Sequence, residues 1–527
     1  MPITSTSYAS IKSAKTIEKT FATSGSVLTP RKLIAGGYDP ANTSVVEGEV
    51  YEDLTAAKAA TIFGYGSQLH RMVMYSILGS TGAIQTDVIA LPAAASGVAA
   101  TKTITFATTA TSSGKFYFRL GSYLTTDLLK LTITNGETVS DAADALVTLV
   151  NNKSSLPFTA SATTGVVTLT AKTADETSED LLCTVSIGDG EDDYLPSGMT
   201  VTIADGTTGA DQSDLTGLTD YLEAEDTPRY TSVVQPYYDT DIMDTFSTLV
   251  GNPNDVSGLY DDLDYRPFNC YFANTTGGSA QLDVLTALGA ARLNDCANVL
   301  FAAPSYPELA YEIACYVSGI IDLQSLTASS NGYTRLSLSY LWGPITPSDD
   351  FTTHSDDSTI KAYENRNDLV TAGIAPIIYK DGLATPGDVT GFWHPDDNQN
   401  APFKYVVNRI KIWNIRNLVN EYLNKDSLKD CPIVYNADAV KPSERPVDVD
   451  ILKTGLSAVA GICESYAWLY AASFTITNMT VTENEDNPDR FDITFPVIIS
   501  GNNRVNSAEI DVDRNLQAVD LTISTAA

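Results

Sequence analysis

The feature that most constrains the fold is a regular alternation of apolar and amphipathic segments between residues 230 and 320. Three apolar runs, YTSVVQPY, FNCYFAN and ANVLFAAP, are followed by segments with a helical period, IMDTFSTLVGN, LDVLTALGAARLN and YPELAYEIACYVSGI. Short, continuously apolar runs are typical of strands buried on both faces, and the helical segments are long enough to connect parallel neighbours. This stretch therefore predicts a parallel β/α core.

The same architecture hosts nucleotide-binding enzymes, but the chain carries none of their motifs. The sequence has no Walker A loop, no GxGxxG after a strand, no HExxH and no GxSxG. Its three histidines, at positions 70, 354 and 394, share no spacing. The turn Gly64-Tyr65-Gly66-Ser67 lacks a preceding strand and a phosphate-binding lysine, so a tight connection between two helices explains it better than a phosphate site. We predict no enzyme, no cofactor and no metal site.

The charge of the chain argues against polyanionic partners. Sixty-five acidic residues against 32 basic residues give a formal net charge of −33. Such a charge disfavours binding to nucleic acid or to an anionic membrane, and it keeps identical copies apart. The chain has no apolar run of about 18 residues, so no transmembrane helix is expected. The six cysteines are widely spaced without a CxxC pair, which suits buried thiols in a reducing cytoplasm.

The ends of the chain differ from its centre in amino-acid composition and in the pattern of apolar residues. Residues 1–25 are rich in Ser, Thr and Ala, lack an apolar secretion signal, and suggest an extended arm, with a disordered tail as the alternative. Residues 26–92 and 213–400 are expected to form the central α/β domain. Residues 515–527 alternate apolar and polar side chains and are expected to form a second extended arm.

Two further domains are expected around this centre. Residues 93–212 contain short Thr- and Val-rich strands and one helical stretch, so they predict a β-rich domain inserted into the central one. Residues 401–514 combine two amphipathic helices with alternating strands and predict an α+β domain. The predicted fold class is therefore mixed, α+β with α/β, in several domains.

The whole chain resembles the tail sheath proteins of contractile-tailed phages, in the Mu-like subgroup. The passages that carry the resemblance follow the order found in that family: SVVEGEVYEDLTAAKAATIFGYGSQLHRM, LPSGMTVTIADGTTGADQSDL, YTSVVQPYYDTDIMDTF, GAARLNDCANVLFAAP, NDLVTAGIAP and FKYVVNRIKIWNIRNLVNEYL. The Thr-rich strands between the first two passages also fit. The acidity of the chain and the polar residues around Ser348–Asp357 depart from the pattern.

The resemblance implies a structural protein of the virion tail that is made and assembled in the host cytoplasm. Its copies would form hexameric discs, stack helically around the tail tube and contract to drive the tube through the host envelope. The implied partners are further copies, the tube protein, and the baseplate and tail terminator proteins, without nucleic acid or membrane insertion. In such sheaths the terminal arms add strands to neighbouring copies, the C-terminal domain faces the tube, and inserted domains face outward.

The residues suggest how the arms could connect copies. Strand addition uses main-chain hydrogen bonds, so it can hold copies together while their globular bodies rotate. The predicted strand donors are Tyr8, Lys12, Lys15 and Lys19 in the N-terminal arm and Val519, Leu521 and Ile523 in the C-terminal arm. The predicted acceptor sheet contains Phe474, Ile476, Phe491, Ile493, Phe495, Ile510 and Val512.

Charge suggests two more specific contacts. Residues 1–36 hold five basic residues and one acid, a net charge of +4, whereas residues 473–527 hold nine acids and three arginines, a net charge of −6. We therefore expect the arm lysines to lie near carboxylates of a neighbour's C-terminal sheet. The basic helix Phe403–Asn424 could face an acidic tube, or its charges could solvate one face or pair within the domain. The candidate tube contacts are Lys404, Arg409, Lys411 and Arg416.

Two other functions stay open at this point. One is an α/β enzyme that binds a nucleotide or small molecule in the crevice of residues 230–320. The other is a non-contractile repeating protein such as a surface adhesin.

Overall fold

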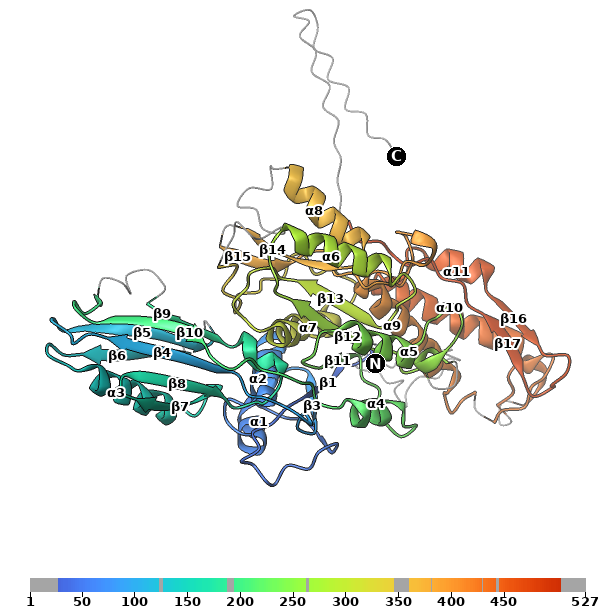
Figure 1. The fold of residues 1–527 in the computed structure, drawn as a ribbon. Coiled ribbons are helices and arrows are strands. Elements are labelled where there is room, and N and C mark those ends of the chain that lie inside the picture. The colour runs from blue at the N-terminus through green and yellow to red at the C-terminus, as the bar shows by residue number, and fades with distance from the viewer. Residues whose placement is uncertain are drawn as a thin grey trace, which may run out of the picture.

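A computed structural model of the chain shows an elongated molecule with a large sheet at its centre (Figure 1). The structure describes residues 27–122, 127–186, 194–261, 265–345, 360–380, 382–428, 430–441 and 445–503. None of the helices in these ranges is both long and apolar enough to cross a membrane. All six cysteines are unpaired, and four of them are buried, as the sequence predicts.

The central sheet has eight strands in the order β15-β14-β13-β12-β11-β1-β3-β2. Its six inner strands run parallel, and the two edge strands, β2 and β15, are antiparallel to their neighbours. The strands are β1 (Arg31–Gly36), β2 (Val50–Tyr51), β3 (Gln85–Ala90), β11 (Ser232–Val234), β12 (Asn269–Asn274), β13 (Asn298–Ala302), β14 (Ala375–Lys380) and β15 (Leu383–Pro386). The predicted parallel β/α core is confirmed.

Helices cover both faces of this sheet because neighbouring side chains on each strand point to opposite faces. Ile34 and Val234 pack on one face with α2 and α7, and Leu33 and Val233 pack on the other with α5 and α6. The helices of this region are α1 (Ala56–Phe63), α2 (Gln68–Ser80), α4 (Thr216–Glu223), α5 (Thr240–Val250), α6 (Ser279–Ala290), α7 (Ala310–Thr327) and α8 (Ile360–Thr371).

The glycine turn after α1 joins two helices, as predicted. Ser67 caps α2 by accepting a hydrogen bond from His70 N at 3.3 Å. Gly66 has φ +79°, and a Cβ on it would lie 2.2 Å from the carbonyl oxygen of Leu156. The glycine is therefore needed both for its backbone conformation and for the close approach of residue 156.

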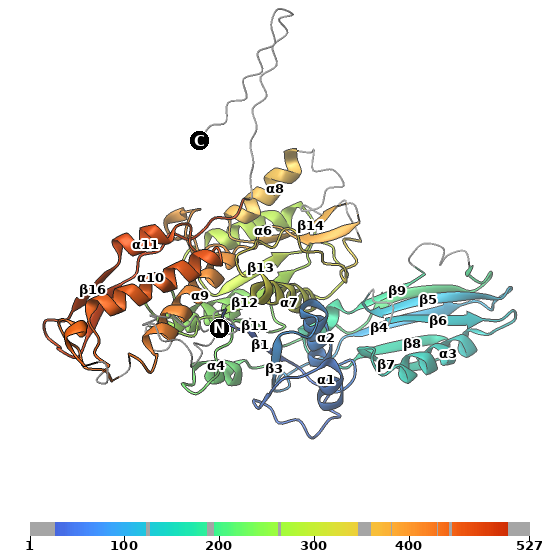
Figure 2. The same cartoon turned by 180° about the vertical axis from the view of Figure 1, so that it is seen from behind.

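Residues 101–205, which we call the β-rich insert, form two antiparallel sheets and one helix at one end of the molecule (Figures 1 and 2). The sheet orders are β10-β4-β8-β7 and β6-β5-β9. The elements are β4 (Thr101–Ala107), β5 (Gly114–Gly121), β6 (Leu128–Ile133), α3 (Val139–Asn152), β7 (Phe158–Thr163), β8 (Val166–Ala171), β9 (Leu182–Val185) and β10 (Thr200–Asp205). The short strands and the helix that the sequence predicts there are present.

A buried ion cluster fixes the insert to the centre. Arg71 of α2 lies 2.6 Å from Glu312 Oε1 of α7 and 3.1 Å from Asp127 Oδ2 of the insert. Ser122 Oγ donates a second hydrogen bond to Asp127, at 2.7 Å. Burial raises the pKa of Glu312, and the attraction of Arg71 opposes that shift. One guanidinium therefore joins two helices of the centre to the base of the insert.

The C-terminal unit, residues 406–503, lies at the opposite end of the central sheet from the insert (Figures 1 and 2). It has its own apolar core, which includes Leu418, Leu456, Trp468 and Val481. Its elements are α9 (Val406–Leu423), α10 (Val449–Ser465), α11 (Ala472–Asn478), β16 (Thr480–Glu483) and β17 (Phe491–Thr494). The first half of α9 packs in the central core and the second half packs here, so this helix connects both.

One predicted strand is wrong in its first half. The alternation of FTITNMTVTE predicts a strand from Phe474, but Phe474 and Ile476 lie in α11, and the strand β16 begins only at Thr480. Ala472 and Thr475, three residues apart, are the buried positions of α11, which is the spacing of one helix face. Packing of this face overrides the strand preference of the β-branched residues.

Close packing of α2 on α7 generates a stability prediction. A Cβ on Gly79 would lie 2.2 Å from the carbonyl oxygen of Tyr316, so Gly79→Ala forces the two helices apart. We expect it to lower the free energy of unfolding by about 1–3 kcal/mol, measured by urea denaturation of the subunit. Gly461→Ala is the matched control because a Cβ there meets nothing within 4 Å. Its helix should gain up to about 1 kcal/mol, and equal effects of the two substitutions would contradict the prediction.

Candidate inter-subunit surface

The hairpin of β16 and β17 is the part of the fold best suited to accept further strands. The two strands pair antiparallel from Thr480↔Thr494 to Glu483↔Phe491. Within the described residues they form a two-stranded sheet, so each strand has one unpaired edge. A two-stranded sheet is only marginally stable alone, and an unpaired edge presents main-chain donors and acceptors to another strand. Both edges of the hairpin are therefore candidate docking sites.

The structure places only part of the predicted acceptor sheet in this hairpin. Phe491 and Ile493 lie in β17, Phe495 follows it, and all three pack half-buried against the C-terminal core. Phe474 and Ile476 belong instead to α11, where they are 38% and 43% exposed, so their assignment to the sheet is wrong. Outside the described residues lie Ile510, Val512 and all seven predicted strand donors, Tyr8, Lys12, Lys15, Lys19, Val519, Leu521 and Ile523.

The turn of the hairpin is strongly acidic. Its exposed acids are Glu483, Glu485, Asp486 and Asp489. Arg490 is engaged by Asp492, at 2.7 Å. A hydrogen bond from Asn484 to Asp492, together with Arg490, lowers the pKa of the Asp492 carboxyl. The turn therefore presents carboxylates to a cationic partner.

The basic side chains of α9, and that of Lys404 just before the helix, are directed into the protein. Lys404, Arg409 and Lys411 are fully buried, and Arg416 lies 3.7 Å from the centre of the Tyr265 ring. Lys404 donates to Thr371 O at 3.1 Å, and Arg409 donates to Asn269 Oδ1 at 2.8 Å and to Phe403 O at 2.6 Å. Lys411 donates to Ser500 O at 2.7 Å and to Asn502 Oδ1 at 3.0 Å.

The prediction of tube contacts is therefore wrong for the three buried residues, because a buried side chain cannot face another protein. The alternative, that these charges solvate one face or pair within the domain, holds only for Lys411, because Lys404 and Arg409 also bond to Thr371 and Asn269 of the centre. The physical reason is that α9 is enclosed on several sides, so these side chains find main-chain carbonyl and amide oxygens rather than water.

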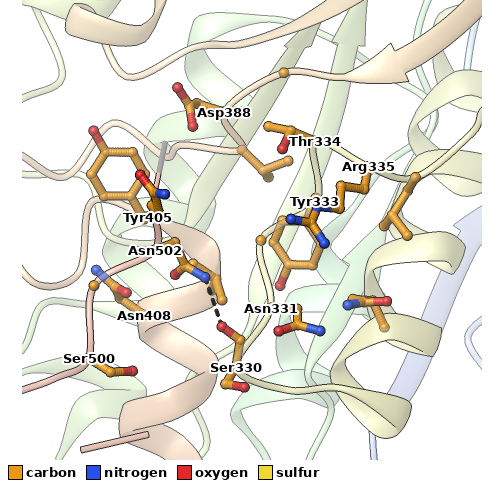
Figure 3. Close-up of a pocket in the computed structure, with 18 of the residues that line it drawn as sticks. Ser330, Asn331, Tyr333, Thr334, Arg335, Asp388, Tyr405, Asn408, Ser500 and Asn502 are labelled. Atoms are coloured by element: carbon orange, nitrogen blue, oxygen red, sulfur yellow. Dashed lines mark hydrogen bonds between the residues drawn. The ribbon is translucent and has the colours of Figure 1, made fainter. Parts of the chain in front are cut away.

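A pocket of about 680 Å³ lies where the C-terminal unit meets the centre (Figure 3). Residues 330–336 line one side, and Asn408, Ser500 and Asn502 lie on the other. Amide and hydroxyl groups predominate in its wall, with Arg335 and Asp388 as the charged members. Among the described residues no cluster of His, Cys, Asp or Glu could hold a metal ion.

The crevice of residues 230–320 is a poor site for a nucleotide. A small pocket of about 230 Å³ at the carboxyl ends of β11 and β12 is lined by Glu176, Glu179 and Asp180 of the insert. Carboxylates repel phosphate groups, so this lining opposes the position where an open α/β sheet would bind a nucleotide.

Two of the three histidines have structural roles. His70 is buried and accepts a hydrogen bond from Gly66 N at 3.0 Å, and burial lowers the pKa of its imidazole to about 4. His394 contacts the carbonyl oxygen of Phe392. His354 lies outside the described residues.

Comparison with known proteins identifies the relationship. No family model matches the chain. The chain is similar to the Mu-like prophage FluMu tail sheath protein of Haemophilus influenzae, with 29% identity over 226 residues. Over these residues the chain resembles a Mu-like tail sheath protein. The match covers 42% of this chain and 44% of that protein, so it spans less than half of the relative. It confirms the predicted resemblance.

Two solved structures are also similar to this chain. The sheath tail protein of Desulfitobacterium hafniense has a TM-score of 0.43 and 12% identity, covering 89% of this chain and 97% of that one. The helical sheath of the anti-feeding prophage in its contracted state has a TM-score of 0.42 and 10% identity, covering 93% of this chain and 94% of that one.

The structure adds residues that the sequence does not single out. Asn414 of α9 is buried and accepts a hydrogen bond from Leu28 N at 2.6 Å. Ser500 and Asn502 bind Lys411 of the same helix. The first and last described segments of the chain therefore meet on α9. A buried asparagine within an apolar helical pattern is the only sequence signal, and it does not name a partner.

Burial of Lys411 generates a pH prediction. Burial lowers the pKa of its ammonium group from 10.5 to about 8. Between these values the unfolded chain binds this proton more tightly than the folded one, so stability rises as pH increases from about 8 to about 10.5. Lys411→Met should remove this rise.

The measurement is the difference in Tm between the wild type and Lys411→Met, which should grow in favour of the wild type from pH 7.5 to pH 10. Lys130→Met, at an exposed lysine of β6, is the control and should leave the pH profile unchanged. A difference in Tm for Lys411→Met that stays constant over this range would contradict the prediction.

Proposed function

We propose that the chain is the structural subunit of a contractile tail sheath. Its copies polymerise as stacked hexameric discs around a tail tube, and contraction of the sleeve drives the tube through the host envelope. The observation that carries this proposal is the match to a tail sheath protein over 226 residues. The partners would be further copies, the tube protein, and the baseplate and tail terminator proteins, and the site of action would be the virion tail.

The arms connect neighbouring copies by strand exchange. Residues 1–25 and 515–527 supply strands that pair with the edges of a neighbour's β16–β17 hairpin. The two unpaired edges of that hairpin and its half-buried Phe491 and Ile493 support this arrangement. Main-chain hydrogen bonds supply the attraction, so the pairing is kept while the globular bodies change orientation.

Charge sets which segments meet. The N-terminal 36 residues carry a net charge of +4, and the exposed turn of the hairpin carries Glu483, Glu485, Asp486 and Asp489. Lys12, Lys15 and Lys19 of one copy lie near these carboxylates of its neighbour. Complementary charges at an interface contribute more to the choice of partner and the rate of association than to affinity.

The shape of the molecule supports an orientation in the sleeve. The insert and the C-terminal unit lie at opposite ends of the central sheet (Figure 1). The C-terminal domain, residues 401–514, faces the tube, and the inserted domain, residues 93–212, faces outward. The central domain, residues 26–92 and 213–400, spans the wall between them. Since Lys404, Arg409 and Lys411 are buried, the tube is met by other residues of the C-terminal domain.

Contraction requires no fuel bound by this chain. The extended sleeve would be a metastable state in which each copy buries less surface than in the contracted state. Release by the baseplate then shifts the population toward the state with the larger interface.

Imaging of the chain expressed alone tests the proposal. Copies that carry both arms and acceptor edges should form hollow, striated cylinders, visible by negative-stain electron microscopy and sedimenting far faster than a 56.4 kDa monomer. Strictly monomeric particles at high protein concentration would contradict a self-assembling sheath.

Reversing the charge of the arm tests the proposed pairing. Substitution of Lys12, Lys15 and Lys19 by glutamate should slow or prevent sleeve formation, most strongly at low ionic strength, because the arm then repels the acidic turn. The measurement is the pelleted fraction in high-speed sedimentation over a range of salt concentrations.

The control reverses Lys58, Lys115 and Lys130, which lie in the centre and the insert and change the net charge of the chain by the same amount. It should assemble like the wild type. Normal sleeves from the arm variant at every salt concentration would contradict the proposed attraction between the arm lysines and the acidic turn. They would not contradict strand exchange, which depends on main-chain hydrogen bonds.

A further inference from the structure

The last described residues of the chain are held by the centre and the C-terminal unit together. Lys411 binds Ser500 O and Asn502 Oδ1, and Ser500 N donates to Trp468 O at 3.1 Å. Asn502 Nδ2 also donates to Ser330 O at 2.9 Å across one end of the pocket in Figure 3. We call residues 500–502 the C-terminal root, because the chain is fixed here through both main-chain and side-chain groups.

The first described residues are held by the same helix. Leu28 N donates to Asn414 Oδ1 at 2.6 Å, and Asn414 Nδ2 donates to Ile410 O at 2.9 Å. Val27 packs against the C-terminal core and Leu28 against the central core. We call residues 27–28 the N-terminal root, which is anchored by one buried asparagine and two apolar contacts.

The two anchoring side chains are neighbours on α9. Lys411 and Asn414 are three residues apart, and residues at this spacing lie next to each other on a helix surface. The helix runs without a break for 18 residues, and Arg409 ties it to Asn269 of β12 at 2.8 Å. One buried turn of α9 therefore sets the distance between the two roots.

We propose that the turn Lys411–Asn414 of α9 is a mechanical node that transmits force between the two terminal arms. This inference rests on the strand exchange in the proposed function. If one arm is bound to one neighbour and the second arm to another, tension that crosses a copy enters at one root and leaves at the other. The force then passes through a single helical turn at the edge of the central core and does not have to cross the insert.

Such a path has a consequence for contraction. The distance between the roots stays constant, so the spacing of connected neighbours is kept while the bodies of the copies reorient. The two roots act in series, since an interruption at either one breaks the path. Two independent local anchors would instead each contribute their own share to the sleeve.

Whether the effects of two substitutions on sleeve stability add distinguishes roots that act in series from two independent anchors. Lys411→Met removes the donor to the C-terminal root, and Asn414→Leu removes the acceptor of the N-terminal root. Sleeves of each single variant and of the double variant are titrated with urea at pH 7.5 and followed by sedimentation. The same cycle of variants on dissociated subunits, followed by fluorescence, measures any local coupling between the two positions, which is then subtracted.

If the two roots act in series, each single variant should lower the urea midpoint of sleeve dissociation. The double variant should then dissociate at the lower of the two single-variant midpoints. Lys102→Met is the matched control, because it removes a lysine of the insert that donates to Glu179 O and Asp205 Oδ1, far from both roots along the chain. Its sleeves should keep the wild-type midpoint. Additive effects on the sleeve, or variants that behave like Lys102→Met, would overturn the node.

Deletion of residues 1–26 separates this outcome from a failure of the proposed function. Sleeves that form normally without these residues would overturn strand exchange by the N-terminal arm itself. Loss of sleeves on deletion, combined with variants at Lys411 and Asn414 that behave like the control, would overturn only the node.

Discussion

Two buried ion pairs hold the layers of the central domain against each other, and the rest of the molecule depends on them. Lys32 of β1 lies 3.1 Å from Asp322 of α7, and Arg71 of α2 lies 2.6 Å from Glu312, also of α7. Removal of one partner from a buried pair typically costs about 3–5 kcal/mol, because the other charge is left without compensation. These pairs therefore fix α7 on the sheet and α2 on α7, and the insert is attached to that frame through Asp127.

The central sheet with α2 and α7 carries the insert at one end and the C-terminal unit at the other, and these two parts present different surfaces. The apolar core of the insert, between its two sheets and α3, continues into that of the centre, and the two parts are also joined by the buried ion pair of Arg71 with Asp127 and by the close approach of Gly66 to Leu156. The C-terminal unit has a core of its own, but its hairpin keeps two unpaired edges and an acidic turn. A rigid body with unfinished main-chain pairing at one end is what a subunit linked by exchanged strands requires. In the proposed sleeve the parallel sheet, which alone would suggest an enzyme, would have the role of a spacer.

The sequence predicts the parts of this fold that repeat a simple period. The strands near Val233, Tyr271 and Leu300 and the helices between them follow from apolar runs and a helical spacing, since both faces of the sheet are buried. The same reasoning fails at Phe474, where β-branched residues imitate a strand while Ala472 and Thr475 pack as one helix face. It also fails at Lys411, because a basic residue in an amphipathic pattern is normally solvated. Its partners, Ser500 and Asn502, are about 90 positions away, and contacts at such a separation produce no repeating pattern in the sequence.

The high negative charge of the chain bears on how such a subunit can assemble. Copies with a net charge of −33 repel one another at distances up to roughly the Debye length, about 8 Å at physiological ionic strength. Apolar contacts between whole faces would have to overcome that repulsion over a large area. In the proposed sleeve, strand addition would concentrate the attraction in a row of main-chain hydrogen bonds, which carry no net charge, and the basic arm would reverse the sign of the interaction only at the acidic turn. The distribution of charge, rather than its total, would then let like-charged copies associate in one register.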